Sequence, residues 1–147
     1  MKTGGGCAGL AAALLASAPC WAAQWFAVGG PREPAPRTLV EVDLETLGPR
    51  RHGGEAVIRV SHAAGQAHEK GFHYRSFVGN AHFDCQQRTI TLTSAAYYRL
   101  AQGQGDRLGT DSAGSASGMP PGLLRTIPAA EQQALLRATC ATKLPSS

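Results

Sequence analysis

The chain has 147 residues, of which 16% are charged and 43% hydrophobic, and it carries a formal charge of +4. That length suits one domain rather than two independent cores. The apolar fraction is too high for a wholly disordered chain, and no apolar run reaches the roughly 18 residues that a membrane-spanning helix requires. The composition therefore predicts one globular domain without a membrane span.

Residues 1–22 have the pattern of a signal peptide. Lys2 supplies a positive charge, and residues 8–18 form a short apolar stretch. Small residues then occupy positions −3 and −1 of a cleavage site after Ala22. A lipid anchor on Cys20 is the alternative. We expect export to the periplasm or the cell surface.

The exported part, residues 23–147, would retain two cysteines, Cys85 and Cys140. Two thiols in an exported chain predict one disulfide bond. Loss of Lys2 would lower the formal charge from +4 to +3. An exported chain with so little net charge and no basic stripe is not expected to bind nucleic acid.

Several segments show the two-residue alternation of a half-buried strand. These are residues 25–28, 37–43, 55–61, 72–78 and 85–93. Residues 44–54 predict turns, with one helical turn capped by Asp43. Gly65 is expected in a polar connection, and Gly79-Asn80 is expected to separate two strands. Strict alternation places Cys85 on the threonine face of its strand. Either a bulge near Gln86-Gln87 changes the alternation, or that face is partly covered.

Residues 103–122 are rich in glycine and serine and predict a flexible loop, which is either a tolerated insertion or a binding loop. A helix should begin at Pro128, which suits a first helical position. Leu136 and Cys140 would share one helical face, so that face can pack on the sheet and bring Cys140 near Cys85. The predicted fold class is α+β: a single curved antiparallel β-sheet with a C-terminal α-helix tethered by a disulfide.

No catalytic or metal-binding motif is present. The five histidines, which are His52, His62, His68, His73 and His82, lack HExxH spacing, and the two cysteines lack CxxC spacing. His62 and His68 flank a polar turn, where exposed histidines are ordinary. A hydrolase that uses His73 or His62, with Ser76 and Asp84 as partners, would lack the GxSxG motif. We expect no enzyme, no cofactor and no metal, and we keep the hydrolase as a third hypothesis.

Arginine supplies eleven of the fourteen basic residues. Clustered arginines would suit a sulfated or acidic partner, whereas dispersed ones form a solvated surface, which the charge of +3 favours. Arg50 and Arg51 are adjacent and are candidate ligand-binding residues. Tyr97 and Tyr98 are two more, because neighbours on a strand face opposite ways and an exposed tyrosine can anchor an interface. Exposed sheet edges would also allow a homodimer by strand pairing.

The order of several short motifs resembles the surface-adhesin protein E family of exported bacterial proteins. The motifs, spread over residues 25–140, are Trp25-Phe26-Ala27-Val28-Gly29, Val42-Asp43, Arg50-Arg51, Tyr74-Arg75-Ser76, Asp84-Cys85, Tyr97-Tyr98, Ile127-Pro128 and Ala138-Thr139-Cys140. The resemblance implies an antiparallel sheet and a C-terminal helix joined by a Cys85–Cys140 disulfide.

The resemblance also implies adhesion through host matrix glycoproteins such as vitronectin and laminin. We therefore expect a non-enzymatic binding protein of the envelope or cell surface. Its partner would be an extracellular-matrix glycoprotein or an anionic envelope glycan. The alternative is a periplasmic structural or accessory protein with no host ligand.

Overall fold

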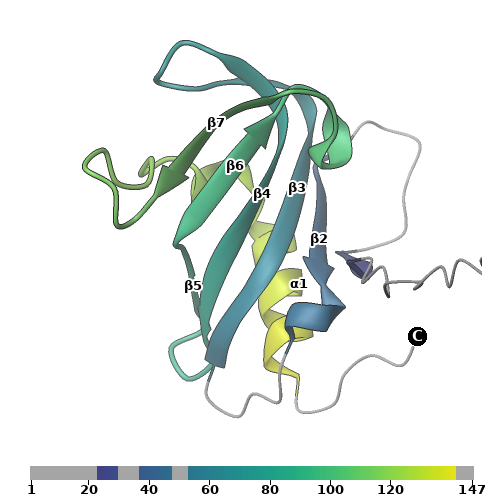
Figure 1. The fold of residues 1–147 in the computed structure, drawn as a ribbon. Helices are drawn as coiled ribbons and strands as arrows, with labels where there is room; N and C mark the ends of the chain where they lie inside the picture. Colours follow the sequence, from purple (N-terminus) through teal and green to yellow (C-terminus); the bar gives the residue numbers. More distant parts are fainter. Residues whose placement is uncertain (1–22, 30–36, 48–52, 142–147) are drawn as a thin grey trace, which may run out of the picture.

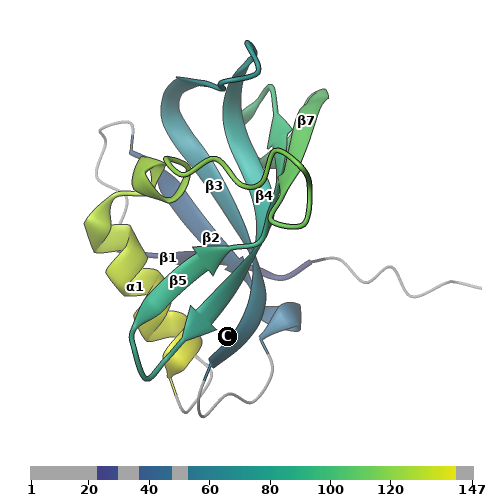
Figure 2. The same ribbon diagram turned by 90° about the vertical axis from the view of Figure 1, so that its left-hand side faces the viewer.

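The computed structural model describes residues 23–29, 37–47 and 53–141, so the predicted signal peptide lies outside the described residues. Seven antiparallel strands form one open sheet in the order β1-β2-β3-β4-β6-β7, with β5 also paired to β4. The strands are β1 (Trp25–Val28), β2 (Leu39–Asp43), β3 (Gly53–Ala67), β4 (His73–Asp84), β5 (Thr89–Leu92), β6 (Ser94–Tyr98) and β7 (Arg107–Ser112). One α-helix, α1 (Ala129–Cys140), packs on one face of the twisted sheet (Figures 1 and 2). The predicted fold class is confirmed.

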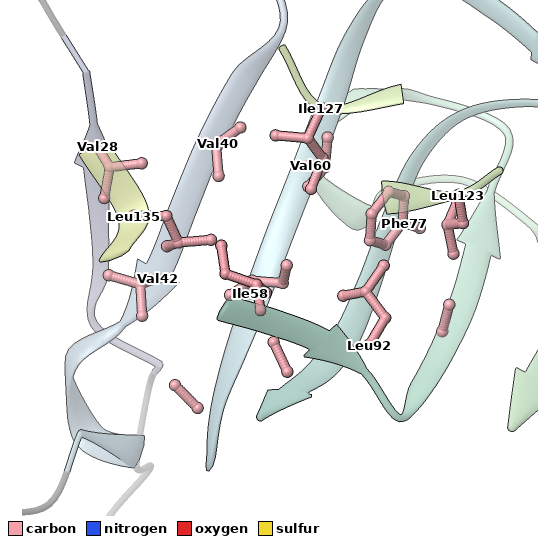
Figure 3. Packing of buried hydrophobic residues seen from close by; sticks show 14 of the residues in the cluster. Val28, Val40, Val42, Ile58, Val60, Phe77, Leu92, Leu123, Ile127 and Leu135 are labelled. Carbon is pink, nitrogen blue, oxygen red and sulfur yellow. The ribbon is translucent and has the colours of Figure 1, made fainter. Parts of the chain in front are cut away.

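The core lies between α1 and the inner face of the sheet. Inward-facing residues of β2 and β3, among them Val42 and Ile58, are 0% exposed, as is Leu135 on the helix. Figure 3 shows these side chains converging from the two layers. Burial of each such aliphatic side chain contributes about 1.5–3 kcal/mol before the entropy cost of folding. The alternation predicted for residues 55–61 is confirmed.

A short 3-10 helix, η1 (Leu44–Thr46), follows β2. Its cap is Asp43, whose carboxylate accepts hydrogen bonds from the backbone N–H groups of Glu45 and Gln24, both at 3.1 Å. A side-chain oxygen at this position satisfies an N–H group that the first turn would otherwise leave unpaired. The predicted capped turn is confirmed, and the same carboxylate ties β1 to the end of β2.

The predicted breaks at Gly65 and at Gly79-Asn80 are wrong, because β3 and β4 run through them. At Gly65 the register shifts between Ser61 and Gln66, which marks an irregularity of the bulge type rather than the end of the strand. At Gly79 a Cβ atom would collide with the carbonyl oxygen of Ser94. This glycine therefore permits the close approach of β4 and β6.

The strand predicted over residues 85–93 is shorter, because Cys85 and the next three residues form the turn between β4 and β5. Alternation consequently does not extend to Cys85, and neither explanation of its parity is needed. Cys85 is bonded to Cys140 at the end of α1, with 5.5 Å between their Cα atoms. The predicted disulfide is confirmed. The helix begins at Ala129, one residue after its cap Pro128.

The segment predicted as one loop over residues 103–122 contains the strand β7, which pairs with β6. Before it, the 3-10 helix η2 (Ala101–Gly103) covers part of the sheet, and after the loop that follows β7 comes η3 (Leu124–Thr126). Few residues of β7 are apolar. The position of this strand depends on contacts between Asp111 and two residues far away in the sequence, His68 and Lys70. β1 and β7 end the main path of the sheet, and β5, which pairs only with β4, also has an unpaired edge among the described strands. Strand pairing between copies stays a prediction.

Candidate functional site

The face of the sheet opposite α1, here called the outer face, is the side toward the viewer in Figure 1. Neighbouring positions on its central row are Glu41, Arg59, Val78, Ala96 and Thr110, taken from β2, β3, β4, β6 and β7 in turn. One end of this face is covered by η2, whose backbone donates hydrogen bonds to Ser hydroxyls of β3 and β4. In the central row, Glu41 is buried, Val78 and Ala96 are half-buried, and Thr110 is exposed.

Arg59 is committed to contacts within the outer face. Its Nε and Nη2 atoms donate to the two carboxylate oxygens of Glu41 at 2.7 and 2.9 Å. Its guanidinium also lies 4.2 Å from the centre of the Trp25 ring. A bidentate pair of this kind, with side-chain exposures of 14% and 8%, is stronger than a surface ion pair. Arg59 therefore joins β1, β2 and β3 and is not free to hold a ligand.

The two predicted tyrosines face opposite ways, as adjacent strand residues must. Tyr98 lies half-buried on the outer face near η2, whereas Tyr97 is 0% exposed. Burial, and after it the neighbouring Asp111 carboxylate, raises the pKa of Tyr97. Tyr97 therefore has no surface to offer a partner in this conformation, and Tyr98 is the tyrosine that reaches solvent.

Arg50 and Arg51 lie outside the described residues. Gly53, the first described residue after them, pairs with Asp84 at the far end of β3. Tyr98 instead pairs with Ser76, which is opposite Ser61. Eight residues of strand, about 26 Å at about 3.3 Å per residue, separate these two places on β3. Tyr98 therefore lies far from the start of β3, which is the first described part of the chain after Arg50 and Arg51.

Other arginines of the described ranges are dispersed. Arg88 contacts Gln133 of α1, and Arg75 reaches the carbonyl of Ala63 in β3. Arg99 pairs with Asp106 at 3.3 Å, with side-chain exposures of 62% and 79%, so this ion pair contributes little. These contacts agree with the prediction, made from the low net charge, that the arginines are dispersed over a solvated surface and do not form one cluster.

The expectation that His62 and His68 are exposed is wrong, since they are 3% and 8% exposed. The ring of His68 stacks on Phe72 with centroids 4.4 Å apart, and its edge meets Tyr97 at 4.6 Å. His62 lies edge-on to Tyr74 at 5.6 Å. The β3–β4 hairpin thus carries His62 and His68 into an aromatic cluster, where they contact rings that include Phe72, Tyr74 and Tyr97.

A buried carboxylate joins this cluster to β7. Asp111 accepts a hydrogen bond from His68 Nε2 at 2.7 Å and another from Lys70 Nζ, and its side chain is 1% exposed. Burial alone would raise its pKa, but the hydrogen bonds from Lys70 and His68 lower the pKa of Asp111 below its ordinary value. These charge-assisted contacts hold a strand whose own sequence has little apolar character.

His62 behaves differently because no carboxylate compensates for its burial. Its Nε2 atom is buried without a hydrogen-bond partner in the described part of the chain. Burial, and then the positive charge of Arg75, lowers the pKa of His62 to about 4. The residue is therefore neutral at pH 7, and the stability of the fold depends on pH through it.

A groove of about 460 Å³ crosses the outer face beside β7. Its lining combines small aliphatic residues with neutral polar ones and comprises Val57, Val78, Gly79, Asn80, Ser94, Ala95, Ala96, Thr110, Asp111, Ser112, Ser115 and Ser117. This groove was not predicted from the sequence. The alternating small residues of β6 and β7 were the available signal, but they mark a surface only once the two strands are known to pair.

The residues of the hypothetical hydrolase are not assembled. The hydroxyl of Ser76 donates to the Leu100 carbonyl and accepts from the Gly103 N–H. The Asp84 carboxylate accepts from backbone N–H groups of its own turn, and His73 is exposed. In residues 23–29, 37–47 and 53–141, no group of three or more His, Cys, Asp or Glu side chains could hold a metal ion.

Comparison with known proteins gives one match. A family model described as surface-adhesin protein E matches residues 25–141, a range that spans all seven strands and α1. No curated protein and no solved structure matches the chain. Within the described ranges, no helix is long and apolar enough to cross a membrane.

Proposed function

The chain belongs to the surface-adhesin protein E family, and from this premise we propose that it is an exported, non-enzymatic binding protein that attaches to host matrix glycoproteins at the cell surface. The observation that carries the proposal is the extent of the match, which includes β1 at one end and the disulfide-bonded helix at the other. The outer face supports it, because its groove beside β7 is available to a macromolecular partner.

Arg50, Arg51 and Tyr98 are the residues that we propose to contact the glycoprotein. An arginine pair in a short connection can reach carboxylates or sulfates on a partner, and Tyr98 offers a half-buried ring on the outer face. Tyr97 is left out of this set, because its side chain has no exposed surface. Its buried ring instead holds β6, the strand that carries Tyr98, against the core.

Replacing Arg50 and Arg51 together with alanine is expected to weaken binding to immobilised vitronectin and laminin several-fold at low salt. The reason is that a guanidinium group attracts acidic partners through an electric field that salt screens over about 8–10 Å. Binding of the unmodified chain should accordingly fall between about 50 and about 500 mM salt, and the variant should show a smaller fall. Biolayer interferometry over a salt series measures both effects.

The matched control is the double variant Arg125→Ala and Arg137→Ala. Both arginines are exposed, on η3 and α1, and their removal changes the net charge by the same amount. If this control loses as much affinity as the Arg50 and Arg51 variant, the attraction is non-specific. If the unmodified chain binds neither glycoprotein, the proposed function is wrong.

A periplasmic accessory role is the second candidate, and one observation favours it. Arg59 and Arg99 are paired with carboxylates of the chain, those of Glu41 and Asp106, which reduces the positive charge that an anionic host partner would meet. Such a protein would remain inside the outer membrane and associate with envelope components. Its cellular location therefore separates the two candidates.

A further inference from the structure

We propose that the groove on the outer face beside β7 binds an uncharged sugar unit of a glycan. The inference rests on the proposed function and deepens it, because it assigns the class of chemical group that the chain would recognise on a glycoprotein. Its volume, about 460 Å³, falls within the range of about 300–1,000 Å³ that is usual for small-ligand sites.

The floor of the groove is aliphatic and shallow. Val57, Val78 and Ala96 come from three strands and are each half-buried on the outer face. Val78 pairs directly with Ala96, so their side chains lie side by side. Such a floor suits the C–H face of a sugar ring, since burial of apolar surface favours binding without demanding charge.

The rim supplies hydroxyl groups whose orientation the protein already sets. Ser94 Oγ accepts hydrogen bonds from the backbone N–H and the side-chain amide of Asn80, at 3.3 and 2.9 Å. Ser112 Oγ accepts from the Gly114 N–H at 3.3 Å. Neither hydroxyl donates to an acceptor within the described ranges, so both O–H groups are available to a ligand oxygen.

These two donors face each other across the strand pair. Ser94 and Ser112 are register partners of β6 and β7, and Thr110 adds a third hydroxyl on the same face. Beyond them, the loop after β7 is held against the strand by Ser115, whose hydroxyl donates to the Ser112 carbonyl at 2.7 Å. Ser117 lies next to it, at 3.3 Å between the hydroxyl oxygens.

The lining also decides the charge of the ligand. Asp111 is its one ionisable residue, and that carboxylate is 1% exposed and already bonded to His68 and Lys70. No lining residue is therefore available to pair with a sulfate, phosphate or carboxylate. A sulfated or sialylated unit would lose hydration without gaining a counter-charge, whereas a neutral hydroxyl-bearing unit loses little.

A peptide strand suits this groove less well. Backbone hydrogen bonds of a sheet lie in the plane of the strands, so a sheet binds an extended peptide at its edge. The face presents only side chains, and here those are short hydroxyls over an aliphatic floor. Hydroxyls that both donate and accept match the groups on a sugar better than the main chain of a peptide.

The test compares Ala96→Phe, which fills the groove, with Thr91→Phe, which places the same ring on an exposed outer-face position of β5 outside the lining. Calorimetry with lactose, diacetylchitobiose and sialyllactose as probes measures binding. We expect the unmodified chain and Thr91→Phe to bind a neutral probe alike. Ala96→Phe should bind it at least about tenfold more weakly, a loss of about 1.4 kcal/mol. Sialyllactose should bind no more tightly than lactose.

The double variant Ser94→Ala and Ser112→Ala removes the two donors without adding bulk, and it serves if Ala96→Phe fails to fold. We expect a several-fold loss of affinity from it. Binding of a neutral probe should change less than about twofold between about 50 and about 500 mM salt, because no charge is involved. Equal affinity in all variants, tighter binding of the sialylated probe, or no binding of either neutral probe would overturn the inference.

A further experiment, with a glycoprotein as the ligand, distinguishes failure of this inference from failure of the proposed function. Vitronectin is compared before and after enzymatic removal of its glycans. Binding that is lost on deglycosylation and in Ala96→Phe supports both proposals. If binding survives both deglycosylation and Ala96→Phe, the adhesive function stands, but the groove is not the site of binding. Absence of vitronectin and laminin binding, together with binding of a neutral probe, overturns the adhesive function alone.

Discussion

Replacing Cys85 and Cys140 together with serine is expected to lower the free energy of unfolding by about 4 kcal/mol. The bond closes a loop between residues that are 55 positions apart, and it ties the end of α1 to the turn after β4. Without it, the unfolded chain gains the conformational entropy that the cross-link had removed. The helix would then be held on the sheet by its apolar contacts, such as those of Leu135 and Leu136.

Urea unfolding followed by circular dichroism measures this effect. We expect the midpoint of the double variant to fall by about 2 M relative to the unmodified chain, given a slope of about 2 kcal/mol per molar urea. A reducing agent should shift the unmodified chain to the same midpoint and leave the variant unchanged. If residues 23–147 titrate with two free thiols in the native state, the disulfide and its contribution to stability are both refuted.

Lowering the pH from about 7 to about 4 is expected to remove about 3 kcal/mol of stability through His62 alone. The unfolded chain takes up a proton at this residue below its ordinary pKa of 6.5, whereas in the folded chain the pKa of His62 is about 4. Within that window the unfolded state binds more protons, so stability falls as the pH falls. Asp111 acts at lower pH, because its pKa lies below the ordinary value of 3.8 and its stabilising effect is lost only there.

The variant His62→Leu isolates this contribution. Leucine places an apolar side chain of similar size between Tyr74 and Phe77, and it has no group that can bind a proton. Urea midpoints at pH 7.5 and pH 4.5 should differ by clearly less in this variant than in the unmodified chain. A matched control is His82→Leu, at an exposed position of β4, which should leave the acid loss intact. Equal acid loss in all three chains would show that His62 is not the source.

The parts of the fold that could be predicted from the sequence depend on local signals. Alternation identified the strand over residues 55–61 because its two faces differ in polarity. Asp43 was recognised as a cap because a side-chain oxygen there accepts a hydrogen bond from an N–H group of the next turn, and the structure shows that bond from Glu45. The helix followed from Pro128 at its start and from the four-residue spacing of Leu136 and Cys140. The disulfide followed from the presence of two cysteines in a chain expected to be exported.

The errors concern residues whose environment is set by distant parts of the chain. Gly65 and Gly79 were interpreted as breaks, yet one lies in an irregular stretch of strand and the other permits two backbones to approach closely. β7 was interpreted as loop because its stability comes from Asp111, which contacts residues about forty positions away. His62 and His68 are buried by rings from other strands, which no local pattern reveals.

The candidate site was predictable only in part. Sequence reasoning placed Tyr97 and Tyr98 on opposite faces, but it could not tell which of them faces outward. Burial on the helix side decides this, since Tyr97 packs against Phe77 and Tyr74. Arg50 and Arg51 lie outside the described residues, so their contribution stays a prediction. The groove forms only because β6 pairs with β7. This pairing was not predicted, because the glycine- and serine-rich composition of residues 103–122 indicated a loop.

The most direct measurement of the central claim is the accessibility of the exported chain on intact cells. Cells are treated with an external protease, and residues 23–147 are followed by immunodetection beside a known periplasmic protein as control. An adhesive surface protein should lose its signal while the periplasmic control survives. Full protection of the chain would contradict surface attachment to host glycoproteins and would favour the periplasmic accessory role.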